Sequence, residues 1–443
     1  MKKTSRKKST SQKLKTTGAS TKPESSNVSV PPHPPMKTVR VGMIGFAGRG
    51  WGHLEHLLML EGTKVTALCE MRADTLEKGA KLAVDKGRPR PALYGPDRNA
   101  YRRMLERNDI DIVFIATDWN THAPIAVQAM QSGKHVFLEV PAAVTTDQCW
   151  ELVETSEKTH LNCMMLENAC YGREELMVLN MVRQGLLGTL LHGEAAYIHD
   201  LRMQMDDNTY PIGTWRTLHY AKRNGNLYPT HGLGPIAQYM NINRGDRFDR
   251  LVSMSSPSAG RKLYAAEKFP ADHKWNKIKE WCCGDINSSL IRTALGRTIL
   301  VQWDETSPRP YTRHNLIQGT KGCWAGFPDR LVVEGRTPST HKWVQGKKLK
   351  PWYNEFDHPL WKRMGKEAVK SGGHGGMDFL MIWRLIYCLR NGVPLDQDVY
   401  DAAAWSVIGP LSEKSVRKGN ALVAIPDFTR GRWKDRPPLG IVR

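Results

Sequence analysis

The segment that governs the architecture of this chain is VRVGMIGFAGRG, at residues 39–50. Its first half is a short apolar run typical of a strand, and its second half is a glycine-rich turn that opens a helical pattern. The spacing is that of G-x-G-x-x-G, with Ala47 at the second glycine position. Such a turn lets the backbone approach a pyrophosphate at a helix N-terminus. The segment therefore predicts a strand, a dinucleotide-binding turn and a helix.

The residues that follow alternate between apolar runs and helical patterns. Further strands are expected at residues 64–70, 111–117, 135–140 and 161–166, and helices at 51–60, 73–86, 122–132 and 146–159. Strands that are apolar on both faces and separated by helices indicate a parallel sheet covered by helices. We therefore predict a Rossmann domain over residues 37–166.

The pattern changes after about residue 185. Alternating segments, typical of antiparallel strands, are found at residues 190–198, 250–255, 288–295, 298–303 and 315–319. Helical patterns return at residues 361–370, 377–390 and 399–418. The predicted class is α/β: the Rossmann domain, then an α+β domain over residues 167–443 with an open, mostly antiparallel sheet and C-terminal helices. We expect the open face of this sheet to bind the substrate and to contact a partner subunit in a homo-oligomer.

The chain is basic, with 64 Lys and Arg against 44 Asp and Glu, a net charge of +20. Residues 1–36, rich in Lys, Ser, Thr and Pro, are predicted to be a disordered basic tail. A tether to nucleic acid or an acidic membrane is the alternative function for this tail. The remaining charge is spread thinly, so no nucleic-acid partner is expected.

The eight cysteines show no zinc spacing, so no metal site is predicted, and His53 and His56 lack a third ligand. No apolar run approaches the roughly 18 residues of a membrane span. The N-terminus has no apolar segment of a secretion signal. We therefore expect a cytoplasmic protein.

The cofactor prediction rests on residues that follow the expected strands. Glu70 ends the second strand, where a carboxylate accepts hydrogen bonds from ribose hydroxyls and repels a 2′-phosphate, so NAD is favoured over NADP although Arg72 is near. Parallel sheets bind ligands at the carboxyl ends of their strands. The expected cofactor-binding residues are Gly45, Gly48, Arg49, Gly50, Glu70, Trp119, Asn120, His122, Glu139 and Val140.

Together these residues resemble the Gfo/Idh/MocA oxidoreductase superfamily, whose usual Glu-Lys-Pro motif reads Glu139-Val140-Pro141 here. A narrower resemblance, to glycoside hydrolase family 109, is carried by residues 48–50, 119–122, 139–141, 168–171, 213–216, 228–235 and 374–379. This resemblance implies an NAD-dependent α-N-acetylgalactosaminidase that oxidises the sugar transiently at C3, eliminates the aglycone, adds water and reduces C3 again. The alternative is an NAD-dependent sugar or cyclitol oxidoreductase.

The resemblance also implies roles for single residues. His231 is expected, in a shaped loop, to be the base for the C3 hydroxyl, because its pKa suits proton exchange near neutrality. Tyr171 is expected either to take the C2 proton or to orient the sugar, and Asn168 to hold the nicotinamide. His374 is expected to cap the pocket or to be a turn residue. The expected substrate-binding residues are Tyr197, Trp215, Arg216, Tyr228, Pro229, Thr230 and Tyr311.

Overall fold

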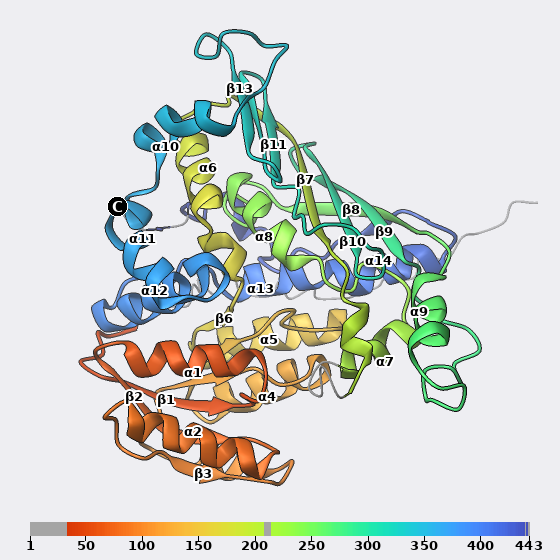
Figure 1. Cartoon of the computed structure of the whole chain (residues 1–443). Coiled ribbons are helices and arrows are strands. Elements are labelled where there is room, and N and C mark those ends of the chain that lie inside the picture. The colour runs from red at the N-terminus through yellow and green to blue at the C-terminus, as the bar shows by residue number, and fades with distance from the viewer. Residues whose placement is uncertain (1–32, 208–213, 439, 442–443) are drawn as a thin grey trace, which may run out of the picture.

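The computed structural model describes residues 33–207, 214–438 and 440–441, which form two sheets with helices packed against them. Figure 1 shows the Rossmann sheet at the bottom of the molecule and the larger sheet at the upper right. Residues 1–32 of the predicted tail lie outside the described residues. Residues 33–36 are part of the fold, since the His33 ring packs against His135 and the Met36 amide donates to the Leu389 carbonyl. This corrects the predicted start of ordered structure at Lys37.

The first sheet is parallel throughout, with the strand order β3-β2-β1-β4-β5-β6. Its strands are β1 (Val39–Ile44), β2 (Thr63–Cys69), β3 (Ala92–Tyr94), β4 (Ile112–Ile115), β5 (His135–Leu138) and β6 (Cys163–Met165). Its helices are α1 (Arg49–Met59), α2 (Ala73–Asp85), α3 (Ala100–Leu105), α4 (Trp119–Gln131) and α5 (Thr146–Thr159). The central strands are buried on both faces, which explains their continuous apolar sequences. The predicted Rossmann fold is confirmed.

The second sheet has the order β14-β13-β12-β11-β7-β10-β9-β8-β15. Its strands are β7 (Leu190–Ile198), β8 (Phe248–Ser255), β9 (Ile286–Thr293), β10 (Thr298–Asp304), β11 (Leu316–Gly319), β12 (Gly322–Ala325), β13 (Arg330–Val333), β14 (Val344–Gln345) and β15 (Val423–Ala424). Strands β7 and β10 pair in parallel, and the other pairings are antiparallel. The sheet is therefore mostly antiparallel, as predicted.

Helices cover one face of this sheet, and they also position the residues of the candidate site. Helix α8 (Thr230–Tyr239) lies on β7 so closely that a Cβ on Gly232 would be 2.3 Å from the Ala196 nitrogen. Helices α6 (Arg173–Arg183) and α14 (Ile408–Arg417) pack nearby, and α14 covers β8. The other face exposes side chains such as Met254 and Leu290.

The C-terminal helices join the two sheets. The remaining helices are α7 (Thr214–Lys222), α9 (Gly260–Lys268), α10 (Lys350–Phe356), α11 (Pro359–Ser371), α12 (Met377–Asn391) and α13 (Val399–Ser406). Figure 1 shows α12 and α13 between the sheets, where α12 packs on α1 and α13 packs on α5. The single helix predicted at 399–418 is two helices, because Pro410 has no N–H to donate to the Ser406 carbonyl. Across the described residues, no helix combines the length and the apolar character that crossing a bilayer requires.

A buried ion pair fixes the start of α13. The Asp401 carboxylate accepts hydrogen bonds from the Arg244 guanidinium, at 2.7 Å to each oxygen, and from the Asn243 amide at 3.1 Å. Asp401 also accepts from the backbone of Asp398 in a capping box. Removing one partner of a buried pair leaves the other charge without compensation.

We expect Asp401→Ala to lower the free energy of unfolding by about 3–5 kcal/mol, because the buried Arg244 guanidinium loses the carboxylate that binds both of its terminal nitrogens and keeps only its ion pair with Asp398. Urea unfolding followed by tryptophan fluorescence measures the change. The matched control is Asp85→Ala, which removes the exposed pair with Lys81 and should cost less than about 1 kcal/mol. Equal losses in the two variants would contradict a structural role for this pair.

Candidate active site

The glycine turn at the end of β1 leaves room that any side chain would fill. Gly45 has φ +74°, and a Cβ on it would lie 2.7 Å from Thr117 Cγ2. A Cβ on Gly50 would lie 2.5 Å from the Gly45 carbonyl oxygen. No described side chain caps the start of α1 at Gly48. A close-approach turn before an uncapped helix N-terminus fits a dinucleotide pyrophosphate.

Glu70 holds the backbone of this turn in place. One carboxylate oxygen accepts from the amides of Phe46 (2.8 Å) and Ala47 (3.1 Å), and the other accepts from Met71 (2.7 Å) and Arg72 (3.2 Å). A ribose hydroxyl that binds Glu70 has to share or replace one of these bonds. The ribose contact stays a prediction, and the turn contact is an additional role that the sequence did not indicate.

Arg49 crosses from the turn to the C-terminal helices. Its guanidinium donates to both oxygens of Asp378, at 2.6 and 2.7 Å, while Asn168 Nδ2 donates to the same carboxylate at 2.6 Å. His374 Nδ1 lies 2.7 Å from Asp378 and its side chain is 60% exposed. Burial would raise the pKa of Asp378, but the bonds from His374 and Arg49 hold it well below its usual range. The sequence predicted Arg49 and Asn168 as cofactor-binding residues. In the structure both bind Asp378, so they connect the glycine turn to α12.

Glu139 forms a second buried ionic contact beside the first. Its Oε1 lies 2.6 Å from His53 Nε2 and 3.3 Å from Arg49 Nε, and its Oε2 accepts from the Val140 amide at 3.2 Å. Burial opposes ionisation, but the hydrogen bond from His53 and the charge of Arg49 lower the pKa of Glu139 to about 2. An ionised carboxylate therefore lies at the carboxyl end of β5.

His122 does not fit the predicted contact with a cofactor. Its two ring nitrogens lie 2.8 Å from the Pro141 carbonyl and 3.1 Å from the Thr117 carbonyl, and the residue is buried. Burial also lowers the pKa of His122. Both nitrogens therefore face backbone carbonyls, the protonated one donates to its carbonyl, and His122 positions the loops that follow β4 and β5.

Trp119 belongs to an aromatic cluster that extends into the second domain. Its ring stacks on Tyr228, with centroids 5.6 Å apart, and meets the edge of Trp215 at 5.2 Å. The neighbouring Asn120 amide lies 3.4 Å from His219 Nε2. Trp119 therefore supports the sugar wall, which is the group of predicted substrate-binding side chains Tyr197, Trp215, Arg216, Tyr228 and Tyr311. Asn120 faces α7.

The central polar contact of the site joins His231 to Glu167. His231 Nδ1 lies 2.6 Å from Glu167 Oε1, and His231 Nε2 lies 3.3 Å from the Tyr228 hydroxyl. Glu167 is fully buried, and its other oxygen has no hydrogen-bond partner among the described residues. A carboxylate behind Nδ1 favours the tautomer that leaves Nε2 free to accept a proton. Sequence reasoning missed Glu167, although it directly follows an expected strand.

The location of His231 also differs from the prediction. It is the second residue of α8 and follows Pro229 and Thr230, rather than lying in a loop. Pro229 and Thr230 are buried, so they position His231 instead of forming a wall for the sugar. Gly232 allows the close packing of α8 on β7, and Gly234 allows close contact with Glu167, Cys170 and Trp405.

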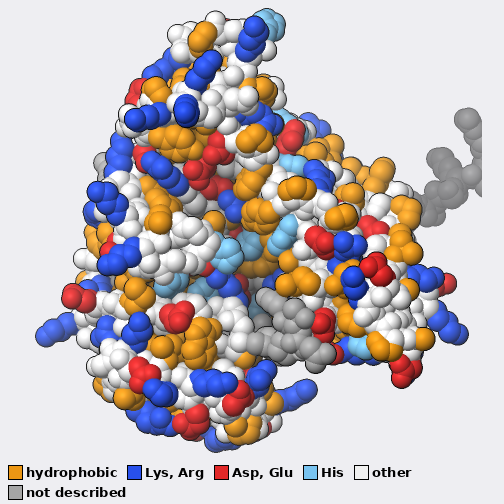
Figure 2. Space-filling view, in the orientation of Figure 1, with side chains coloured by type: hydrophobic (Ala, Val, Ile, Leu, Met, Phe, Trp, Pro, Cys, Tyr) orange, Lys and Arg blue, Asp and Glu red, His pale blue; other side chains and the backbone are white. Residues whose placement is uncertain are grey.

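Three tyrosines surround His231. The centroid of the Tyr197 ring lies 4.7 Å from that of Tyr228 and 5.2 Å from that of His231. The Tyr311 ring centroid lies 6.2 Å from that of Tyr197, and 41% of the Tyr311 surface is exposed. Burial raises the pKa of each of these phenols, so all three are neutral. The His199 ring contacts the rings of Tyr197 and Tyr311, with centroid distances of 4.7 and 5.1 Å. Sequence reasoning did not identify His199 as a site residue. Figure 2 shows histidine side chains around the hollow in this face.

Arg216 supplies the positive charge of this wall. Its guanidinium lies 4.9 Å from the centre of the Tyr228 ring and 5.4 Å from Trp119. It forms no ion pair with a described residue, so its planar donors can meet the oxygen atoms of a ligand. Trp215, the preceding residue, faces a neighbouring cavity rather than the three tyrosines.

Tyr171 is not the base that the sequence predicted. It is 1% exposed, and its hydroxyl donates to the Asp396 carboxylate at 3.3 Å. Burial raises the pKa of Tyr171 well above its usual value. Its carbonyl accepts from the Trp361 indole at 2.9 Å, so both ends of the residue serve packing.

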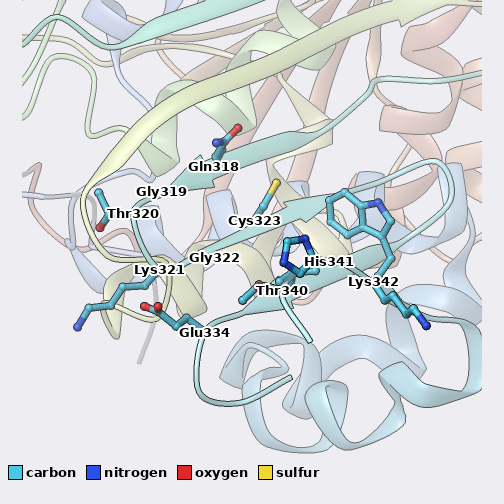
Figure 3. A pocket seen from close by; sticks show the side chains of 12 residues that line it. Gln318, Gly319, Thr320, Lys321, Gly322, Cys323, Glu334, Thr340, His341 and Lys342 are labelled. Atoms are coloured by element: carbon cyan, nitrogen blue, oxygen red, sulfur yellow. The ribbon is translucent and has the colours of Figure 1, made fainter. Parts of the chain in front are cut away.

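A cavity of about 440 Å³ lies away from these residues, on β11, β12 and β13. Figure 3 shows Cys323, Glu334 and His341 around it. Burial raises the pKa of the Cys323 thiol to about 11, so this thiol is not activated. None of the predicted site residues lines it. Within the described part of the chain, no group of three or more His, Cys, Asp or Glu side chains has the arrangement of a metal site.

The glycine turn yields a direct test of cofactor binding. Gly50→Ala should weaken NAD binding by at least about tenfold, because the new Cβ collides with the Gly45 carbonyl and displaces the turn that holds the pyrophosphate. Fluorescence titration of stripped protein with NADH measures the affinity. Gly52→Ala, in the same helix with no atom within 4 Å of the new Cβ, is the control and should bind as the wild type does. Unchanged binding by Gly50→Ala would contradict this position for the pyrophosphate.

Comparisons with known proteins agree with the two-domain structure. The profile of the oxidoreductase family NAD-binding Rossmann fold, GFO_IDH_MocA, matches residues 39–167, and that of the glycosyl hydrolase 109 C-terminal domain matches residues 171–435. A glycosyl hydrolase family 109 protein of Shewanella putrefaciens is 58% identical over 92% of this chain and 89% of its own length. One from Shewanella pealeana is equally similar, with the same coverage.

Solved structures share the fold at low sequence identity. An oxidoreductase domain protein from Kribbella flavida superposes with a TM-score of 0.65 at 18% identity, covering 88% of this chain and all of its own. A levoglucosan dehydrogenase in complex with NADH and L-sorbose gives the same values. With a turn built for a dinucleotide and relatives this similar over nearly the whole length, the chain belongs to glycosyl hydrolase family 109 and carries the NAD-binding Rossmann domain of the Gfo/Idh/MocA oxidoreductases.

Proposed function

We propose that the chain hydrolyses terminal α-N-acetylgalactosamine residues and keeps NAD bound throughout. The observation that carries the proposal is the His231–Glu167 pair, which faces a wall of neutral tyrosines. The pair adjoins the cofactor turn, because Asn168, next to Glu167, shares the Asp378 carboxylate with Arg49. When bound, NAD⁺ supplies a hydride acceptor for sugar C3 and returns the hydride at the end, so no net oxidation occurs.

His231 acts on the C3 hydroxyl in this proposal. Glu167 accepts the hydrogen bond of His231 Nδ1–H, so Nε2 is the nitrogen that takes the hydroxyl proton while C3 loses its hydride. The imidazolium that forms is stabilised by the buried charge of Glu167. His231 gives the proton back when C3 is reduced again.

His199 replaces Tyr171 as the group that takes the C2 proton. Its ring contacts the same Tyr197 ring as His231 does, and it also contacts the Tyr311 ring, which is partly exposed. Burial lowers the pKa of His199, so the ring is neutral and can accept a proton. Once C3 is a ketone, the C2 proton is acidic enough for such a base.

The bond to the aglycone breaks by elimination. The electron pair of the C2–H bond forms a C1–C2 double bond as the C1–O bond breaks, and the departing oxygen takes a proton from solvent. Water then adds its oxygen to C1 and releases one proton to solvent, while His199 delivers a proton to C2. Arg216, over the Tyr228 ring, is placed to donate to the N-acetyl carbonyl.

The alternative is a sugar or cyclitol oxidoreductase, which the likeness to the levoglucosan dehydrogenase fold favours. The two functions differ in what accumulates. An oxidoreductase builds up NADH in proportion to a free sugar, whereas the proposed hydrolase cleaves glycosides and leaves its cofactor oxidised at the end of each cycle.

Hydrolysis of 4-nitrophenyl α-N-acetylgalactosaminide in heavy water should place deuterium at C2 of the released sugar, because His199 exchanges its proton with solvent between elimination and hydration. Mass spectrometry of the sugar measures the incorporation. His231→Ala and His199→Gln should each lower turnover by about 10²–10⁴-fold with NAD still bound. His192→Ala, on the outer face of β7, is the control and should keep its activity. Full turnover with C2 unlabelled would exclude the elimination route.

We further propose that the open face of the second sheet pairs two copies of the chain. Val252, Leu290 and Leu300 are direct cross-strand neighbours on β8, β9 and β10, and they form an apolar row on that face. The next strands add Glu194 opposite Leu300 and Leu316 opposite Glu194. An apolar row with a polar border is typical of an interface between subunits.

Leu290→Lys should shift the sedimentation coefficient to that of a monomer, because it places a charge in the middle of the apolar row. Analytical ultracentrifugation at several concentrations measures the assembly. Leu263→Lys, at an exposed leucine of α9, should leave the assembly unchanged. A wild-type protein that sediments as a monomer at all concentrations would contradict the proposal.

A further inference from the structure

A cavity of about 560 Å³ lies between α7, α14 and the N-terminal ends of α4 and α5. Its volume is within the roughly 300–1,000 Å³ of ligand pockets. Trp215, Lys222 and Arg223 line it from the α7 side, and Glu413 and Arg417 line it from α14. The mechanism proposed above uses none of these five residues.

The charges around this cavity do not cancel. Arg223 pairs with Glu413, its Nε lying 3.0 Å from the carboxylate, so these two neutralise one another. Lys222 and Arg417 form no ion pair with any residue in the described ranges. His219 adds no charge at neutral pH, because burial and the nearby Arg223 lower its pKa to about 4. Within the described ranges, the cavity thus has two cations, Lys222 and Arg417, that pair with no acidic side chain.

The cavity adjoins the proposed sugar wall. Trp215 lines the cavity, and its ring centroid lies 5.2 Å from that of Trp119. Trp119 stacks on Tyr228, with centroids 5.6 Å apart, and the Tyr228 and His231 centroids are 5.0 Å apart. Arg216, the residue after Trp215, lies over Tyr228 from the same helix. The cavity and His231 therefore lie on either side of the buried rings of Trp119 and Tyr228, three ring contacts apart.

We propose that this cavity is a subsite for an anionic saccharide unit, a sugar with a sulfate ester or a carboxylate, linked to the residue that is cleaved. Arg417 and Lys222 donate charge-assisted hydrogen bonds to the anionic oxygens. The Trp215 ring packs against the C–H face of the sugar. The proposal names the substrate class and rests on the glycosidase function proposed above.

Binding tests the subsite without turnover. Calorimetric titration of the NAD-loaded protein, with the active site saturated by N-acetylgalactosamine, compares galactose 6-sulfate, glucuronate, galactose and inorganic sulfate. At least one anionic sugar should bind about tenfold or more tightly than galactose, and added salt should weaken it. Tight binding of inorganic sulfate alone would overturn the proposal by showing an anion site without sugar recognition.

Variants assign the effect to the two cations. The double variant Lys222→Gln/Arg417→Gln should lose the preference for the anionic sugar, while the control Lys347→Gln, an exposed lysine before α10, should keep it. A preference that survives in the double variant would overturn the assignment. Melting curves of the three proteins verify that the variants remain folded.

Turnover separates this inference from the function on which it rests. Two matched disaccharides, α-N-acetylgalactosamine on galactose and on galactose 6-sulfate, should differ in KM by about tenfold with similar kcat, and the double variant should abolish the difference. Equal KM values together with equal binding would refute the subsite while leaving the glycosidase function intact. Failure to cleave either disaccharide would refute that function, and the titrations would still decide the subsite.

Discussion

The buried carboxylate of Asp378 is the contact on which the geometry of the site depends. It binds Arg49, at the glycine turn, and Asn168, which directly follows Glu167. A buried carboxylate stays ionised only while such partners hold it, so this one group fixes how far the cofactor turn lies from the pair that Glu167 forms with His231. Because Asp378 belongs to α12, the site is complete only when the C-terminal helices have packed against the Rossmann domain.

The site therefore has two electrostatic environments side by side. At the cofactor edge, Asp378 and Glu139 are ionised and paired, because the hydrogen bonds and charges of their partners outweigh the effect of burial. At the sugar wall, the tyrosines are neutral because burial raises the pKa of each. Glu167, fully buried behind His231, is then the acid nearest to the proton that moves. The paired carboxylates therefore lie with the nucleotide, and the sugar meets neutral phenols, histidines and the single fixed charge of Arg216.

The sequence predicted the Rossmann domain and the open sheet well, because both follow from local periodicity. The close-approach turn also follows from its spacing, which reflects a backbone constraint, while the ribose contact of Glu70 stays a prediction. The predictions that failed concern where a side chain points and which residues it contacts. Nothing in a linear pattern shows that both nitrogens of His122 meet backbone carbonyls, or that α8 rather than a loop presents His231. Glu167 and His199 were missed because their importance comes from residues that lie far away in the chain.

Tyr171 and Tyr228 show how a tertiary partner decides the role of a side chain. Both phenols are buried, and burial raises the pKa of each. The hydroxyl of Tyr171 donates to the Asp396 carboxylate, so its proton is already held by an acceptor outside the site. The hydroxyl of Tyr228 lies 3.3 Å from His231 Nε2, the nitrogen that Glu167 leaves free. In the proposed mechanism this phenol lies beside the nitrogen that takes the sugar proton, and its raised pKa keeps it neutral there. The same residue type therefore serves packing in one case and adjoins the proposed base in the other, and the identity of the hydrogen-bond partner separates them.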